Sequence, residues 1–160
     1  MVDDMGFSAL HRVILSSKAE GSLISANAFV QAGADINAIV TRDGLSCLHI
    51  AADRNRVEIS RRLIDVEANV HIVNAFTQET PLLRAGHYNS VGMVRYPYDA
   101  RASLESPNRD GETSVRAAAS GDAEAALVLL LHFGADTDQS ISRSRPCCIT
   151  ASSANKLSLK

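Results

Sequence analysis

The sequence predicts an all-α solenoid built from stacked helix–turn–helix units. Residues 43–69 contain two short segments in which apolar side chains recur at helical spacing, with a polar break between them. Related patterns lie on both sides, and each unit closes at an equivalent residue. These closures are Gly33, Glu67, Arg101 and Gly134, so they recur with a nearly constant period of about 34 residues. A fixed period of this length is typical of repeat proteins, whose units bury their apolar faces against neighbouring units.

The unit at residues 43–69 shows its expected elements most clearly. Gly44 can adopt the positive-φ turn that enters the unit. Ser46 is a suitable N-cap for the first helix, because its hydroxyl can accept from free backbone N–H groups. An apolar stripe then starts at Leu48 and continues at the helical spacing. The second helix is expected over residues 57–66, with charged residues on its outer side, and neither helix can bury its apolar face alone.

The first unit begins near Met5, with Ser8 as N-cap and Leu10 in the core. From this leucine to the closure, the chain is longer than the equivalent span of the next unit. Four extra residues therefore lie around residues 16–22. We expect them to enlarge the surface loop between the two helices, because lengthening a loop costs little closure entropy.

The third unit departs most from the pattern. Residues 80–81 (TP) are a strong helix start, because proline at the first helical position loses no hydrogen bond. Its second helix, however, contains Pro97, and an interior proline costs about 3 kcal/mol. We expect this helix to stop or kink near Tyr96. Glu67 and Arg101 stand where glycine usually makes the left-handed turn. A residue other than glycine in this turn costs about 1 kcal/mol of stability, so local stability should dip in the middle of the stack.

The fourth unit restores the pattern, and its second helix, residues 124–133, is the most apolar segment of the chain. After Asp138 the sequence becomes Ser-rich and basic, with no acidic residue. Two interpretations of residues 139–160 stay open. One is a solvated, disordered tail. The other is a partial fifth unit, because residues 145–152 (RPCCITAS) roughly repeat the start of the other first helices.

These features together resemble the ankyrin repeat, whose pattern runs D-x-x-G-x-T-P-L-H-x-A-A and ends G-A-D-x-N. The match is carried by residues 110–113 (DGET), 46–52 (SCLHIAA), 80–82 (TPL) and 33–37 (GADIN). It covers about residues 5–138, as repeats at about 5–37, 41–71, 75–105 and 108–138. The resemblance implies helix–turn–helix units with short projecting β-hairpin fingers, and protein binding as the activity. It also implies that His11 and His49 form hydrogen bonds between neighbouring turns.

The resemblance implies that a protein partner binds on a concave face made by the finger tips and the exposed side of the first helices. We therefore predict a non-catalytic adaptor or scaffold. The positions that the family pattern places on this face are Arg42, Asp43, Leu45, Asp53, Arg54, Phe76, Thr77, Glu79, His87, Tyr88, Arg109, Asp110 and Glu112.

Three of these positions are aromatic or imidazole rings in one repeat. Phe76, His87 and Tyr88 lie on its predicted exposed edge, in a protein with only 4% aromatic residues. Aromatic residues dominate the binding energy of protein interfaces, so we expect these three to anchor the partner. The charged positions are better explained as ordinary solvated residues.

Composition argues against several other functions. The net charge of −2 gives no general footprint for nucleic acid or an anionic membrane. Three cysteines do not form an even disulfide set, and no signal sequence or bilayer-length apolar run is present, so we expect an intracellular protein, cytoplasmic or nuclear. No Walker A loop, Rossmann glycine pattern, HExxH or EF-hand loop occurs. We expect no cofactor, no metal and no small-molecule substrate.

Three alternatives remain from the sequence. A thiol-dependent enzyme could use Cys47 or Cys147, although Cys47 and His49 are two positions apart and would not face each other on a helix. The basic segment 139–160 could tether the chain to nucleic acid or a membrane. The chain could also be a degenerate repeat copy without a specific partner.

Overall fold

The computed structural model describes residues 8–16, 19–39 and 42–137. The described residues form eight helices, arranged as four successive pairs. In chain order these are α1 (Ala9–Leu15), α2 (Ala19–Gln31), α3 (Cys47–Asp53), α4 (Val57–Asp65), α5 (Pro81–His87), α6 (Val91–Asp99), α7 (Ser114–Ser120) and α8 (Glu124–His132).

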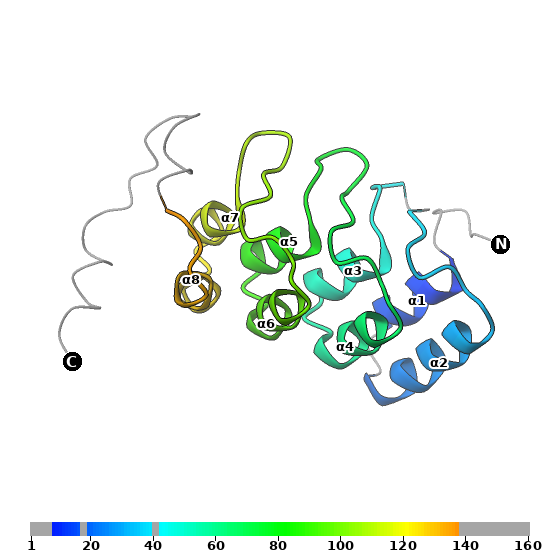
Figure 1. The fold of residues 1–160 in the computed structure, drawn as a ribbon. Helices are drawn as coiled ribbons and strands as arrows, with labels where there is room; N and C mark the ends of the chain where they lie inside the picture. The colour runs from blue at the N-terminus through cyan, green and yellow to red at the C-terminus, as the bar shows by residue number, and fades with distance from the viewer. Residues whose placement is uncertain (1–7, 17–18, 40–41, 138–160) are drawn as a thin grey trace.

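The helix pairs stack side by side in two rows, as the sequence predicted. The first helices α1, α3, α5 and α7 form one row, and the second helices α2, α4, α6 and α8 form the other (Figure 1). Each helix contacts its equivalent in a neighbouring repeat as well as the other helix of its own pair. An all-α solenoid is therefore confirmed.

Small residues let the first helices approach each other closely. Ala51, Ala52 and Ala85 have no exposed surface. A Cβ atom added to Gly86 in α5 would lie only 2.8 Å from the carbonyl oxygen of Ser114 in α7. Larger aliphatic side chains such as Leu48 fill the space between the two rows.

The loops between repeats project as fingers beyond the first-helix row (Figure 1). Finger one comprises residues 32–46, apart from 40–41, finger two residues 66–80 and finger three residues 100–113. The described parts of these loops contain no regular β-strand, so they differ from the hairpins that we expected. Each of the last two fingers is closed at its tip by a short turn, through Asn74 N–H to Glu79 O (2.8 Å) and Asn108 N–H to Glu112 O (2.9 Å).

The expectation of an enlarged loop in the first repeat is wrong for the residues that the structure describes. Helix α2 begins at Ala19 and has 13 residues, whereas α4 has 9. The insertion therefore lengthens this helix. A helix has 3.6 residues per turn, so an insertion of four adds about one turn and leaves the apolar face in register.

We predicted that the second helix of repeat three stops or kinks near Tyr96, and it does not stop there. Helix α6 continues through Pro97 to Asp99. Met93 and Val94 in this helix are fully buried, and burying each such side chain contributes about 1.5–3 kcal/mol. This gain is comparable to the cost of the proline. Lower local stability in this repeat stays a prediction.

The closures take the expected left-handed geometry. Gly33 and Gly134 have φ values of +80° and +86°, and Glu67 and Arg101 adopt nearly the same turn at +66° and +64°. Both interpretations of residues 139–160 fall outside the described residues.

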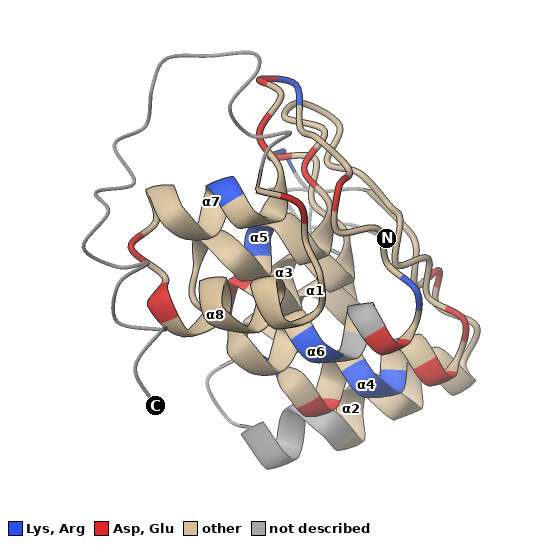
Figure 2. Cartoon of the chain, turned by 60° about the vertical axis from the view of Figure 1, so that its left-hand side comes forward, with Lys and Arg blue, Asp and Glu red and all other residues tan. Residues whose placement is uncertain are grey.

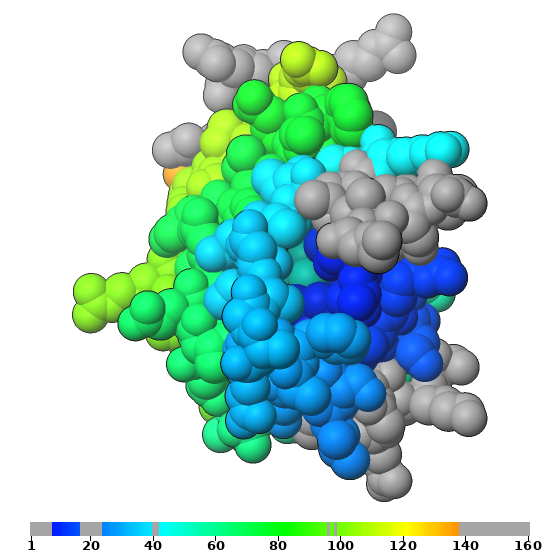
Figure 3. Space-filling model, turned by 90° about the vertical axis from the view of Figure 1, so that its right-hand side faces the viewer, coloured from blue at the N-terminus to red at the C-terminus, as the bar shows by residue number. Residues whose placement is uncertain are grey.

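Charged residues of both signs are interspersed over the helices and finger tips of the described chain (Figure 2). Viewed from its N-terminal end, the surface is formed largely by α1, α2 and the segment that follows α2 (Figure 3). Among the described residues, no helix has the length and apolar character needed to cross a membrane.

Candidate partner-binding groove

A groove of about 510 Å³ lies between the finger tips and the first helices of the first three repeats. We call it the central groove. Seven of the thirteen predicted binding residues line it, which places them together as the resemblance implied. Its lining residues are Leu15, Arg42, Asp43, Leu45, Ile50, Asp53, Arg54, Asn74, Phe76, Thr77 and Arg84.

Leu45 lies in this groove differently from what we expected. It is 9% exposed and belongs to the hydrophobic core. Together with Ile50, which is 2% exposed, it provides an apolar floor and does not project from the finger. The expectation that Leu45 is an exposed finger residue is therefore wrong.

Asn74 fixes the tip of finger two, and the sequence analysis missed it. This residue is 2% exposed. Its amide nitrogen donates to the carbonyl of Asp43 in finger one (2.7 Å), while its Oδ1 accepts from the N–H groups of Phe76 (2.7 Å) and Thr77 (2.9 Å). Asn108, one repeat later, accepts from two N–H groups of finger three in the same way. This recurrence of asparagine at the repeat period was the available signal.

Phe76 is exposed at the edge of the central groove, on this fixed finger. Its relative exposure is 57%. Finger two also lies close against finger one, where Ala75 N–H donates to the carbonyl of Gly44 (3.2 Å). A Cβ atom at Gly44 would lie 2.8 Å from Ala75 Cβ and 3.0 Å from Phe76 Cδ2. Glycine is needed there both for this contact and for its φ of +67°.

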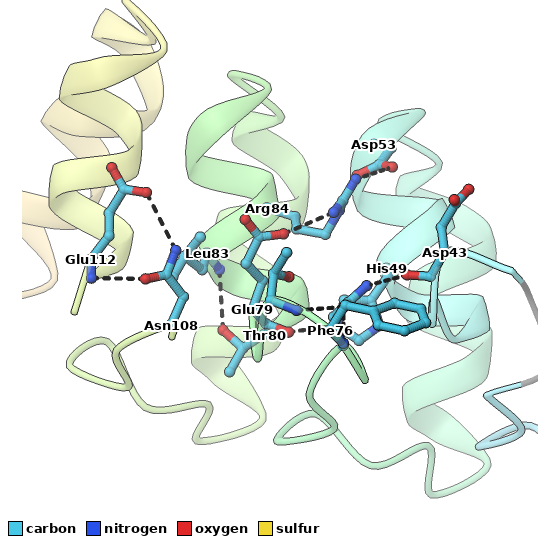
Figure 4. A network of polar contacts seen from close by, with 12 residues as sticks. Asp43, His49, Asp53, Phe76, Glu79, Thr80, Leu83, Arg84, Asn108 and Glu112 are labelled. Carbon is cyan, nitrogen blue, oxygen red and sulfur yellow. Dashed lines mark hydrogen bonds and ion pairs between the residues drawn. The ribbon is translucent and has the colours of Figure 1, made fainter. Parts of the chain in front are cut away.

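Arg84 joins two of the predicted residues in an ion-pair network (Figure 4). Its Nε and Nη2 donate to the two carboxylate oxygens of Asp53 at 2.6 and 2.7 Å, and its Nη1 donates to Glu79 at 2.8 Å. Burial alone would lower the pKa of Arg84, but the hydrogen bonds and charges of these partners raise it overall. The network therefore links repeat two to repeat three.

The same contacts change the interpretation of the two acidic residues. Asp53 and Glu79 have side-chain exposures of 19% and 21%, and each is already paired with Arg84. A partner that used either carboxylate would have to compete with this cation. Arg84 was missed because its partner Asp53 lies nearly one repeat away in the sequence.

His49 carries out the role that the resemblance implied. The Ser46 N–H can only donate, so Nδ1 of His49 must accept from it (3.1 Å), and the Nε2 proton then goes to the carbonyl of Glu79 in the next repeat (2.8 Å). The ring is fully buried. Burial is the main cause that lowers its pKa to about 4, so the imidazole is neutral at physiological pH. In repeat one, burial also lowers the pKa of His11, whose Nδ1 lies 2.6 Å from Ser8 Oγ.

His87 and Tyr88 are exposed where helix α5 ends. Tyr88 is 51% exposed, its ring centroid lies 5.0 Å from that of His87, and the guanidinium carbon of Arg84 lies 5.5 Å from it. Arg84 also lines the central groove together with Phe76. Arg84 thus lies against Tyr88 and shares the groove lining with Phe76. The use of the three predicted anchors in binding stays a prediction.

The three predicted residues of finger three lie outside the lining of the central groove. Arg109 and Asp110 are exposed, whereas Glu112 is half-buried and accepts from Asn108 Nδ2 (3.4 Å) and Ser120 Oγ (3.1 Å). The backbone N–H of Arg109 donates to the carbonyl of Thr77 (2.8 Å), so finger three is attached to finger two.

The thiol at Cys47 does not suit nucleophilic chemistry. Its side chain has no exposed surface, and burial raises its pKa to about 12. A nucleophilic cysteine needs the opposite, an accessible thiol with a lowered pKa. This observation overturns Cys47 as a catalytic candidate, while Cys147 lies outside the described residues. Among the described residues, no group of three or more His, Cys, Asp or Glu side chains could hold a metal ion.

Comparison with known proteins agrees with this architecture. The family described as ankyrin repeats (3 copies) matches residues 10–102 and 48–141. The chain belongs to the ankyrin-repeat family. It is also 32% identical over 106 residues to a protein of Saccharomyces cerevisiae called "Probable 26S proteasome regulatory subunit p28". That match covers 65% of this chain and 46% of the yeast protein, so the chain spans about half the length of this relative.

Proposed function

We propose that this ankyrin-repeat chain is a non-catalytic adaptor that binds a protein partner in the central groove. The observation that carries the proposal is the exposed ring of Phe76, held by a fixed finger over an apolar floor. Cys47, the thiol that could have supported an enzyme, is buried in the core.

The rigidity of finger two supports binding at this place. Association costs free energy when loops and side chains must become ordered. The backbone on both sides of Phe76 is already held by the side chain of Asn74 and by the contact with Gly44. Less ordering is therefore needed when a partner covers the ring. Aromatic residues at such positions are frequent hot spots of protein interfaces.

Phe76→Ala tests the site directly. Removing a hot-spot aromatic costs about 2 kcal/mol or more, so we expect the partner's Kd to rise about 30-fold. The matched control is Val128→Ala on α8, because Val128 is 44% exposed but lies far along the stack from the groove. Tyr88→Ala should weaken binding as well. Urea unfolding of each variant shows whether the stack remains folded.

The yeast relative suggests the first probe for this experiment. Because that protein is named as a 26S proteasome regulatory subunit, the first measurement is the binding of purified 26S proteasome to the immobilised wild-type chain. Other proteins that the wild-type chain retains should be tested next. If a partner binds Phe76→Ala and wild type equally, the central groove is not its binding site. The chain would still be a protein-interaction module, with its binding site elsewhere. Such a relative also favours the intracellular location that we predicted.

A degenerate copy without a partner is the competing interpretation. The folded repeat three argues against it, since α6 keeps its core residues Met93 and Val94 buried despite Pro97. Hydrogen exchange distinguishes the two. A functional adaptor should gain protection around Phe76 when its partner is added. A degenerate copy should show no change with any fraction of a cell lysate, and its amides should exchange rapidly throughout repeat three.

A further inference from the structure

Helices α7 and α8 form the C-terminal end of the described stack (Figure 1). This end has the character of an interface between repeats. Ala119 and Leu127 occupy positions that recur at the repeat period. Their equivalents are Ala52 and Ser60 in repeat two, and Gly86 and Val94 in repeat three. All four equivalents are buried, because the next repeat covers them. Ala119 and Leu127 are partly exposed.

The residues at this end are apolar, which is unusual for a terminal unit. We call Arg116, Ala119, Leu127 and Leu131 the C-terminal end face. Leu131 is 37% exposed, and only Arg116 in this set is charged. Terminal repeats normally carry a polar outer face, and a helix that is apolar on all sides is normally buried. This face therefore requires a cover.

The sequence that follows Thr137 supplies one at the right spacing. The first helices of repeats two, three and four begin at Cys47, Pro81 and Ser114, each one repeat period after the last. The step from Pro81 to Ser114, taken once more, leads to Cys147. In the register of residues 147–153 (CCITASS), Cys148 is equivalent to the buried residues Leu48, Leu82 and Val115. Ala151 is equivalent to the buried alanines Ala51, Ala85 and Ala118.

We propose that residues 147–153 form the first helix of a fifth repeat that docks on α7 and covers the C-terminal end face. These residues lie outside the described part of the chain, so the proposal rests on the exposed apolar face and on the repeat spacing. The occupant is a segment of this same chain, joined to α8 by a connection of the usual length.

The contact between α5 and α7 indicates which residues would meet. A Cβ atom at Gly86 would lie 2.8 Å from Ser114 O and 3.6 Å from Ala118 Cβ. One repeat later, Ala119 takes the place of Gly86, and the equivalents of Ser114 and Ala118 are Cys147 and Ala151. Docking therefore brings the side chain of Ala119 next to the backbone carbonyl of Cys147 and the Cβ atom of Ala151.

Disulfide trapping in the full chain tests this contact. Ala119→Cys paired with Ala151→Cys, in a chain that also carries Cys147→Ser and Cys148→Ser, should form an intramolecular disulfide under mild oxidation, because the equivalent Cβ atoms lie 3.6 Å apart. Mass spectrometry of the monomer detects the disulfide, which should be lost when residue 151 is left as alanine. Val128→Cys in place of Ala119→Cys is the matched control, because Val128 is exposed on α8 at the position equivalent to the outward Arg61. It should give little cross-link. Cys47 is buried and should not interfere.

The possible results decide the proposal. A cross-link in most monomers for Ala119→Cys, but not for Val128→Cys, supports docking. Equal trapping of the two positions, or none, would overturn it, and a cross-link found only between chains would place a second copy on the face instead. A second measurement does not need cysteine chemistry: deleting residues 139–160 should speed hydrogen exchange of the α7 amides severalfold, and an unchanged rate would contradict docking.

Discussion

His49 makes the stability of this stack dependent on pH, and the size of the effect follows from its environment. In the folded chain Nδ1 accepts from the Ser46 N–H and the ring is fully buried, so a proton cannot be added without breaking this contact. Burial lowers the pKa to about 4, from an ordinary value of 6.5. The unfolded chain therefore binds a proton in a pH range where the folded chain does not.

The sign and magnitude follow from linkage. Between pH 6.5 and 4 the unfolded state holds more protons, so the free energy of unfolding falls as the pH falls. The contribution is fully present above pH 6.5 and is lost as the pH drops through the folded pKa. A lowering from 6.5 to about 4 corresponds to about 3 kcal/mol. His11 should add a smaller loss of the same sign, because its pKa is also lowered by burial.

Urea unfolding at pH 7.0, 5.5 and 4.5 measures this loss. His49→Gln should be less stable at pH 7, because the Glu79 carbonyl and the Ser46 N–H lose their imidazole partner. It should also depend less on pH than the wild type. His71→Gln is the matched control, since His71 is exposed. If His49→Gln and the wild type lose the same free energy between pH 7.0 and 4.5, the buried imidazole is not responsible for the acid sensitivity.

Two further predictions concern stability at neutral pH. Arg84→Gln leaves two partly buried carboxylates without their cation and should lower the free energy of unfolding by about 2 kcal/mol. The control Arg95→Gln removes an exposed i,i+4 pair and should lower it by less than about 0.5 kcal/mol. Equal losses in urea unfolding would contradict the network. Glu67→Gly and Arg101→Gly relieve left-handed turns at +66° and +64° and should each raise stability by up to about 1 kcal/mol, and a lower Tm in both variants would show that these turns are unstrained.

The repeat period made most of this fold predictable from the sequence. Once one unit was recognised at residues 43–69, the spacing of its closures located the other helix pairs and the left-handed turns at Glu67 and Arg101. Two of the errors in secondary structure, the loop in repeat one and the helix end in repeat three, have a common cause. Local patterns at residues 16–22 and at Pro97 favoured a loop and a helix end. The described residues 19–22 and the segment around Pro97 instead lie in helices that pack against neighbouring repeats.

The sequence brought several candidate residues together but did not show their contacts. Seven of the predicted residues line the central groove, Leu45 among them as part of its buried floor, and their use in binding stays a prediction. The family pattern did not show that Asp53 is paired with Arg84, because local sequence patterns extend over a single turn or helix and this contact joins two repeats. Leu45 was misplaced because the pattern assigns it to a finger, whereas its side chain turns into the core.

The contacts that shape the central groove are also those that hold neighbouring repeats together. Glu79 accepts from His49 through its carbonyl and from Arg84 through its carboxylate, so it serves repeat two and its own repeat at once. Substitutions at these polar residues should therefore change folding and binding together. Phe76 differs, because its side chain is more than half exposed while its backbone carries the hydrogen bond to Asn74. Truncating that ring leaves the inter-repeat contacts in place, which makes it the position where a loss of affinity can be attributed to the partner.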